Sequence, residues 1–366
     1  GDPGVPGGDP RMISRYALAT FYFATNGDDW IECGVDSTKC DRGREWLTAD
    51  SECDWLAVGC AAPDDGNFSV IELFFPAMVH EGKTGNNING ELPFELSLLP
   101  NLEMIVLSKQ ALKGSIPESW SSMTALRTLI ISENDLTGTF PEFLFSQNSL
   151  LRLLYIHDNK LGGPLPAITS TSLEELRIRG NSFNGTIPSA FGEFQNLREF
   201  HADGNLLTGG IPDKLYGLPA LRELRLGANP FGGSISENIA SLQNLEVLNL
   251  TEASMTGVLP SGLFALTNLE TLDLSNNSLS GSLSVDFGNL TNVASIHLNN
   301  NTFSGTIPDA FHSLQYLRKL ELHANDLTGA VSELICNRTG EAFFDISLLT
   351  TDCIEEVECE CCNECY

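Results

Sequence analysis

Residues 126–141 read LRTLIISENDLTGTFP, and most of the chain repeats the pattern of this stretch. The pattern is L-x-x-L-x-L-x-x-N-x-L-x-G-x-I-P, with Phe140 here in the place of Ile. Its Asn recurs at a nearly constant spacing, at Asn134, Asn159, Asn181, Asn205, Asn229, Asn277, Asn301 and Asn325. Gln110 and Ala253 take that position in two further units. Self-similarity at such a period indicates a fold built from stacked repeats.

One more unit is predicted to open the array. Its strand carries Val70, Leu73 and Phe75, and its return segment contains Ile88. The two halves lie further apart than the pattern allows, so residues 76–85 are predicted to form an inserted loop. Such a loop is either functional or a tolerated surface insertion.

The chemistry of the unit predicts its structure. Apolar residues at alternate positions place one side of a short strand inward. The Asn amide bonds backbone groups where the chain leaves the strand, while Gly and Pro suit the turn and the return. A single unit cannot bury its leucines, so neighbours must stack. The sequence therefore predicts an α/β solenoid, a curved right-handed leucine-rich-repeat superhelix of about eleven 24-residue repeats, with a parallel β-sheet on its concave face.

The L-x-G-x-I-P half of the unit resembles the plant-specific class of leucine-rich repeats. That class occurs in receptor-kinase ectodomains and in secreted inhibitors of pectin-degrading enzymes. The motif C-x-W-x-G-V-x-C of plant N-terminal caps is matched by Cys53, Trp55, Val58 and Cys60, with a departure at Ala57. The resemblance implies an extracellular binding protein and leaves its ligand open.

Two terminal segments add to this resemblance. Residues 17–30, ALATFYFATNGDDW, are similar to the amphipathic helix and Asn-Gly turn that open many microbial and algal members. The Cys-rich tail is similar to the ends of secreted diatom proteins of the same class.

The cysteines lie only at the two ends of the chain, which predicts disulfide-bonded caps formed in an oxidising compartment. The predicted disulfide cysteines are Cys33, Cys40, Cys53, Cys60, Cys336, Cys353, Cys359, Cys361, Cys362 and Cys365, with the pairing in each group left open. The predicted organisation is a flexible Gly/Pro linker over residues 1–10, an N-terminal cap with a helix and a hairpin over 11–69, the repeat array over 70–335 and a C-terminal cap over 336–366.

Composition and sequons favour a secreted or cell-surface protein. The net charge of −28 argues against nucleic acid as a partner, and no apolar run is long enough for membrane insertion within this chain. N-glycosylation is predicted at the Asn-x-Ser/Thr sites Asn67, Asn184, Asn249, Asn276, Asn289, Asn300 and Asn337.

The sequence contains no catalytic constellation, so neither an enzyme nor a cofactor is predicted. The motif Cys362-x-x-Cys365 lies among six clustered cysteines, which favours disulfides over a redox site. The same cluster has ligands that suit zinc, but the secreted context favours bridges, so no metal is predicted.

Two positions in each unit, four and two before the Asn, are predicted to face the concave surface because strand side chains alternate. The first units carry an apolar stripe there, and the middle units carry the predicted ligand-binding residues Tyr155, His157, Arg177, Arg179, His201 and Arg225. Guanidinium groups suit carboxylate, sulfate or phosphate, which predicts an anionic ligand. The alternative is a solvated network in which these arginines pair with Asp203, Glu175, Glu199 and Glu223.

Three functions are compatible with these features. The first is an extracellular recognition module that binds a protein, a peptide or an anionic polysaccharide on its concave face. The second is a structural subunit of an extracellular matrix or filament, formed by homo-assembly of the repeats. The third is an inhibitor of a secreted hydrolase, which rests on the resemblance to plant inhibitors.

Overall fold

The computed structural model describes residues 10–33, 44–61, 69–75, 79–80, 83–145, 150–168, 170, 172–338, 346–352, 357–359 and 361–365. The predicted linker over residues 1–10 lies outside this part except for Pro10, which begins the first helix. Contacts divide the chain into two compact units, unit 1 (Gly1–Ser182) and unit 2 (Phe183–Tyr366).

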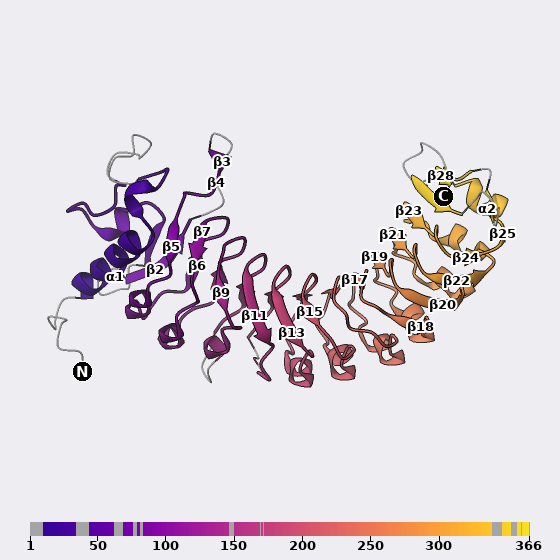
Figure 1. Ribbon diagram of the computed structural model, residues 1–366, viewed down its shortest axis with the longest axis horizontal. Helices are drawn as coiled ribbons and strands as arrows, with labels where there is room; N and C mark the ends of the chain where they lie inside the picture. Colours follow the sequence, from indigo (N-terminus) through magenta and orange to yellow (C-terminus); the bar gives the residue numbers. More distant parts are fainter. Residues whose placement is uncertain are drawn as a thin grey trace. The chain divides into compact units, whose positions relative to one another are not determined.

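Each predicted repeat contributes one short strand to a parallel sheet, and we call these the array strands (Figure 1). Unit 1 contains β2 (Ser69–Phe74), β6 (Met104–Val106), β8 (Thr128–Ile130), β10 (Leu153–Tyr155) and β12 (Glu175–Arg177). Unit 2 contains β14 (Glu199–His201), β16 (Glu223–Arg225), β17 (Val247–Asn249), β19 (Thr271–Asp273), β21 (Ser295–His297) and β23 (Lys319–Glu321). The predicted fold class, a leucine-rich-repeat solenoid with a parallel sheet, is confirmed.

The sheet has additional strands from both caps. In unit 1, β1 (Val58–Ala61) pairs antiparallel with β2. In unit 2, β26 (Leu348–Thr351) continues the parallel sheet beside β23, and β28 (Glu364–Cys365) pairs with β26. These last two strands could not be predicted from the sequence, because the tail lacks the repeat pattern.

The return halves of the repeats form a second layer of short strands and 3-10 helices. The return strands are β5 (Asn89–Glu91), β7 (Ala111–Lys113), β9 (Thr137–Gly138), β11 (Lys160–Pro164), β13 (Ser182–Gly185), β15 (Leu206–Leu207), β18 (Thr256–Val258), β20 (Ser278–Ser282), β22 (Thr302–Gly305), β24 (Asp326–Leu327) and β25 (Gly329–Ala330). Strand β27 (Val357–Glu358) of the C-terminal cap joins this layer by pairing with β25. The 3-10 helices are Phe94–Leu98, Glu118–Ser122, Glu142–Phe145, Ser189–Glu193, Asp213–Gly217, Glu237–Ser241, Ser261–Ala265, Val285–Asn289 and Asp309–Ser313. Many of them begin directly after the Pro of the repeat, as at Pro188 and Pro308, because the ring holds the backbone angle φ near −65°.

The inserted loop contains a small hairpin. Strands β3 (Val79–His80) and β4 (Lys83–Thr84) pair antiparallel, and residues 76–78 and 81–82 lie outside the described part.

The repeated asparagines form an asparagine ladder along the buried side of the turns, with members Asn134, Asn159, Asn181, Asn205, Asn229, Asn277, Asn301 and Asn325. At Asn229, the side-chain oxygen accepts the backbone N–H of Leu207 at 3.0 Å. Its amide nitrogen donates to the carbonyls of Ala202 at 2.9 Å and Leu226 at 3.0 Å. The Asn of each repeat therefore holds the backbone of the preceding repeat. Gln110 partly reproduces this by accepting a hydrogen bond from the backbone N–H of Asn86 at 2.8 Å.

The N-terminal cap packs helix α1 (Pro10–Ala24) over the start of the array. The helix begins earlier than the resemblance implied, at Pro10, which needs no N–H partner at a helix start. Its buried face, with Phe21 and Tyr22 among its members, contacts Trp30 and Trp46 at ring-centroid distances of 5.0 to 6.1 Å. Two 3-10 helices, Gly27–Asp29 and Glu52–Asp54, complete the cap, and the predicted Asn-Gly turn is present at Asn26, whose φ is 53°.

Disulfides are present within each of the two terminal regions, as predicted. Cys53 pairs with Cys60, Cys336 with Cys361 and Cys359 with Cys362; Cys33 is also disulfide-bonded. Cys40, Cys353 and the side chain of Cys365 lie outside the described part. A short helix, α2 (Glu333–Cys336), leads into the C-terminal bridges. Among the described residues, neither helix is both long and apolar enough to cross a bilayer.

Candidate functional site

The side chains of the array strands that point outward form one surface, together with the side chain that lies two residues after the end of each strand. We call this surface the sheet face. Because strand side chains alternate, the inward apolar residue of each array strand, such as Leu154 or Phe200, is buried and its neighbours point away from the core. Unit 1 places the predicted residues Tyr155, His157, Arg177 and Arg179 on this face, and unit 2 places His201 and Arg225 there.

In unit 1, Tyr155 on β10 and Arg177 on β12 stack on each other. The guanidinium carbon of Arg177 lies 4.3 Å from the centroid of the Tyr155 ring. Glu175 holds both partners, since its carboxylate accepts a hydrogen bond from the Tyr155 hydroxyl and lies 3.3 Å from the Arg177 guanidinium. A cation against an aromatic face is attracted by the ring quadrupole, so this pair is a preorganised polar and aromatic surface.

A second group in unit 1 lies where β10 and β12 end. The carboxylate of Asp158 lies 2.9 Å from His157 Nδ1 and 2.9 Å from the Arg179 guanidinium. Burial lowers the pKa of His157 below 6.5, and the nearby charge of Arg179 lowers it further, while the hydrogen bond to Asp158 acts in the opposite direction. His157 is therefore held toward its neutral form.

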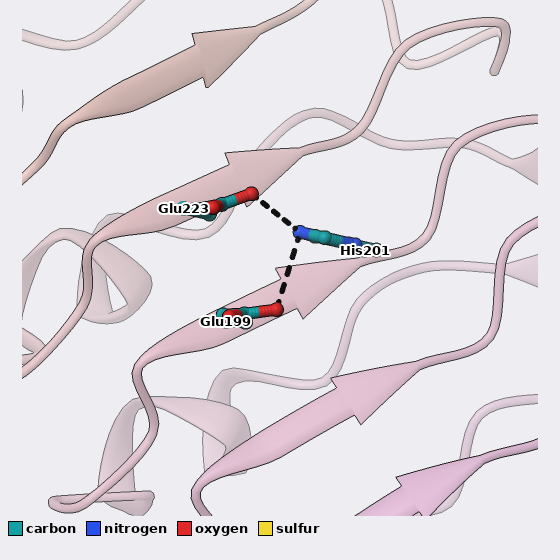
Figure 2. A group of neighbouring side chains, drawn as sticks. All are labelled: Glu199, His201 and Glu223. Atoms are coloured by element: carbon teal, nitrogen blue, oxygen red, sulfur yellow. Dashed lines mark hydrogen bonds and ion pairs between the residues drawn. The ribbon is translucent and has the colours of Figure 1, made fainter. Parts of the chain in front are cut away.

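In unit 2, Glu199 and His201 on β14 and Glu223 on β16 converge (Figure 2). The distance from His201 Nε2 is 3.0 Å to Glu223 Oε2 and 3.8 Å to Glu199 Oε2. Arg225 Nε lies 3.0 Å from the same Glu223 oxygen. Burial raises the pKa of Glu223, but the hydrogen bonds and charges of Arg225 and His201 outweigh it, so the pKa is lowered overall.

All three predicted arginines thus contact carboxylates, at Glu175, Asp158 and Glu223. Two of the pairings foreseen as the alternative to ligand binding are present, Arg177 with Glu175 in unit 1 and Arg225 with Glu223 in unit 2, whereas Arg179 pairs with Asp158, which was not foreseen. Its charges remain accessible, since the side chains of Arg177, Arg179 and Arg225 are 31%, 42% and 38% exposed. Ligand binding by these residues stays a prediction.

Glu175, Glu199 and Glu223 occupy the same position on three array strands, six residues before the ladder Asn. They were not predicted as members of the binding site, although the recurrence of Glu at one position of the repeat could have indicated them. Asp158 was missed as well. Its backbone is in the left-handed region, with φ of 53°, and its side chain contacts His157 and Arg179.

The predicted apolar stripe in unit 1 is less exposed than expected. Phe74 is 45% exposed, but Val106 is only 8% exposed. A cavity of about 330 Å³ beside Phe74 is lined by apolar and charged residues, including Leu56, Glu72 and Arg44.

The sequons differ in accessibility. Five predicted sites are exposed, namely Asn184, Asn276, Asn289, Asn300 and Asn337. Asn249 on the sheet face is half-buried; its amide donates to Asp273 at 3.3 Å and its side-chain oxygen accepts the N–H of Thr251 at 3.1 Å. Asn67 lies outside the described residues.

Two family models match the chain. Residues 171–231 match one described as leucine rich repeat, and residues 268–290 and 292–314 match a second with the same description. No curated protein sequence matches the chain.

Several solved structures are similar to the chain. A TDR receptor is 34% identical, with a TM-score of 0.67 over 73% of this chain and 45% of that chain. The ectodomain of the Arabidopsis receptor kinase HAESA, solved with an N-terminally extended IDA peptide hormone ligand, is 29% identical, with a TM-score of 0.58 over 73% of this chain and 48% of that chain. The chain therefore spans about half the length of these receptor structures.

A plant ice-binding protein is 24% identical, with a TM-score of 0.66 over 87% of this chain and 96% of that protein, a likeness that concerns the fold alone. The sheet topology, the repeat matches and these neighbours lead to one conclusion: the chain is a leucine-rich-repeat protein of the plant-like type.

Proposed function

We propose that this chain is an extracellular recognition module that binds a peptide or protein ligand through its sheet face. The carrying observation is the stacked Tyr155–Arg177 pair, with Arg179 two residues further on the same face. The similar HAESA ectodomain was solved with a peptide hormone, which supports a peptide as the ligand class. Disulfides at both terminal regions and exposed sequons support the extracellular compartment.

The residues of unit 1 suggest what the ligand presents. The ring of Tyr155, whose hydroxyl donates a hydrogen bond to Glu175, offers a rigid apolar surface. Two partly exposed guanidinium groups beside it suit a carboxylate, such as an acidic side chain or the free end of a peptide. In a chain of net charge −28, the carboxylates around the arginines limit non-specific anion binding, so a ligand must also fit the ring.

A peptide library with free carboxyl ends tests this proposal. The secreted, disulfide-bonded chain selects binders from random peptides, and calorimetry measures the affinity of the best one. Replacing Arg177 and Arg179 by Ala should weaken binding at least about tenfold, since hydrogen bonds between charged groups contribute roughly 1.5–3 kcal/mol.

The matched control is the double substitution Arg127→Ala with Arg152→Ala. Both arginines lie in unit 1, just before β8 and β10, and contact Glu103 and Glu174, so the same charge is removed away from the sheet face. An equal loss in the control would contradict the proposal. So would a library without binders, combined with binding of polygalacturonate, an anionic polysaccharide, or with self-association of the chain.

A further inference from the structure

The Glu199–His201–Glu223 group in unit 2 has the composition of a metal site. One imidazole nitrogen and two carboxylate oxygens lie within 4.8 Å of one another. Two of the three residues come from β14 and the third from β16, so the sheet fixes all three backbones (Figure 2). Among the described residues, it is the only such group of three or more His, Cys, Asp or Glu side chains.

We propose that Glu199, His201 and Glu223 form a zinc site on the sheet face of unit 2. Zinc binds nitrogen and carboxylate oxygen at about 2.0–2.2 Å, so tetrahedral ligand atoms lie about 3.3 Å apart. The distances from His201 Nε2 to the two carboxylate oxygens, 3.0 Å and 3.8 Å, bracket that value. Small rotations of the two Glu side chains therefore complete three corners of the tetrahedron, and water takes the fourth.

The ligand types select the metal class. Imidazole suits zinc and its transition-metal neighbours, whereas calcium and magnesium prefer oxygen ligands only. Two carboxylates and a neutral imidazole carry a charge of −2, which a divalent cation neutralises. His201 is 9% exposed, so its ring is already held in place before metal binding.

Arg225 competes with the metal. Its Nε lies 3.0 Å from Glu223 Oε2, the oxygen that also faces His201. Zinc binding must displace this contact or share the carboxylate, which limits the affinity. Removing the arginine should consequently strengthen zinc binding, although it should weaken or leave unchanged the binding of an anionic ligand.

A second pair on the sheet face of unit 2 supplies the internal control. His297 Nδ1 lies 2.8 Å from Glu321 Oε2, so this pair has a similar imidazole and one similar carboxylate. The neighbouring carboxylate of Asp273 is engaged by Ser275, whose N–H and hydroxyl donate to its Oδ1 at 3.1 Å and 2.7 Å. The pair therefore offers two ligands where the proposed site offers three.

The test is calorimetric titration of the full chain with zinc chloride at pH 7.5, with calcium chloride as the second probe. His201→Gln, Glu199→Gln and Glu223→Gln should each weaken zinc binding at least about tenfold, while His297→Gln should leave it unchanged. Arg225→Ala should raise zinc affinity severalfold. Cobalt, as a spectroscopic substitute, should give visible absorption bands that disappear in His201→Gln.

Equal zinc affinity in the wild type and His201→Gln, or an equal loss in His297→Gln, would overturn the proposal. Circular dichroism of each variant separates a lost site from a lost fold. Zinc binding at this site is independent of the proposed peptide binding, because the titrations contain no peptide and Arg225→Ala is expected to raise zinc affinity.

Discussion

The asparagine ladder and the sheet face follow the same period along the chain and use it in opposite ways. In the ladder one residue type returns in unit after unit, and the amide contacts of Asn229 are all to backbone atoms. At one sheet-face position the residue changes from each repeat to the next. It is Tyr155 and then Arg177 in unit 1, and His201 and then Arg225 in unit 2. The repeated buried positions hold the fold, and the varied exposed positions can encode ligand specificity.

The different roles of the ladder and the sheet face can be tested by altering one position of each kind in the same repeat. Asn229→Ala removes the bonds to Leu207, Ala202 and Leu226 and leaves buried backbone groups unsatisfied. We expect a loss of about 3 kcal/mol or more in the free energy of unfolding. Arg225→Ala, on the sheet face of the same repeat, should lower the free energy of unfolding by less than about 1 kcal/mol. Guanidinium denaturation followed by circular dichroism measures both, and similar losses would remove the distinction between ladder and face.

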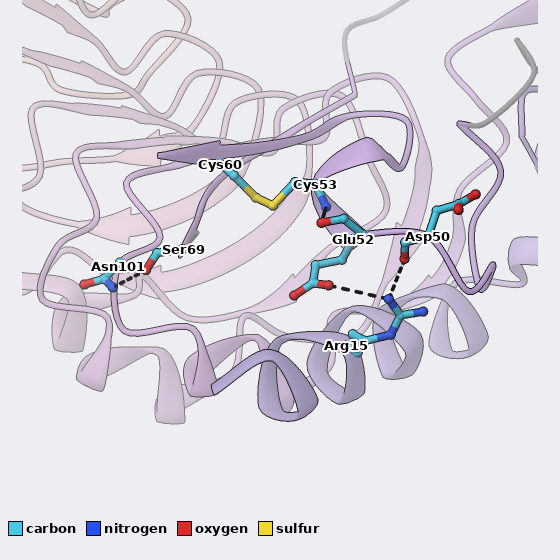
Figure 3. The surroundings of a disulfide bond; sticks show 8 residues. Arg15, Asp50, Glu52, Cys53, Cys60, Ser69 and Asn101 are labelled. Atoms are coloured by element: carbon cyan, nitrogen blue, oxygen red, sulfur yellow. Dashed lines mark hydrogen bonds and ion pairs between the residues drawn. A yellow bond between two sulfur atoms is a disulfide. The ribbon is translucent and has the colours of Figure 1, made fainter. Parts of the chain in front are cut away.

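Removing the terminal disulfides measures how much the caps contribute to the stability of the repeat array. The Cys53–Cys60 bridge closes a separation of 7 residues beside Arg15, which contacts Glu52 at 3.6 Å and the backbone oxygen of Asp50 at 2.6 Å (Figure 3). The Cys336–Cys361 bridge closes 25 residues. Replacing both cysteines of a bridge by Ser should cost roughly 2.5 kcal/mol at the first and roughly 3.5 kcal/mol at the second, because longer loops lose more unfolded-state entropy. The reverse order in denaturant melts would show that local packing outweighs loop closure.

A third, smaller effect concerns the pH dependence of stability. His157 faces Asp158, Arg179 and Glu133, and burial lowers its pKa below the ordinary value of 6.5. The unfolded chain therefore binds this proton more readily, so stability is retained above pH 6.5 and falls as the pH drops through the folded pKa. His157→Gln should flatten this slope between denaturant melts at pH 7.5 and at pH 5.5. An unchanged slope would show that other groups determine it.

The smallest expected effect is on glycan occupancy. Asn300 is exposed, whereas the Asn249 amide is bonded to Asp273 and Thr251 on the sheet face. We expect glycan on Asn300 and little or none on Asn249 when the chain is secreted from eukaryotic cells. Mass spectrometry of the glycopeptides reads the occupancy, and a fully glycosylated Asn249 would mean that this part of the sheet face is covered.

Much of the fold was predictable because each unit repeats the same local chemistry. The spacing of Asn134 and its equivalents placed the array strands, and the alternation of side chains identified which residues point outward. Strand β26 was not predictable, because it pairs through its backbone with β23 and residues 348–351 carry no copy of the motif.

The candidate site was predictable in its positions but not in its contacts. Alternation placed Arg177 and Arg179 on one face. Whether they pair with Glu175 and Asp158 depends on side-chain rotamers, which no periodic pattern encodes. The left-handed backbone at Asp158, in contrast, recurs one residue before the ladder position, as at Glu133 and Asn276.

Hydroxyl-radical footprinting of the chain with its library-selected peptide tests most directly whether the sheet face binds the ligand. The peptide should protect Tyr155 from oxidation. It should leave Leu206 and Val258 unprotected, which lie on the return strands β15 and β18 and are 55% and 61% exposed. Protection of Leu206 and Val258 with unchanged oxidation of Tyr155 would contradict ligand binding at the sheet face.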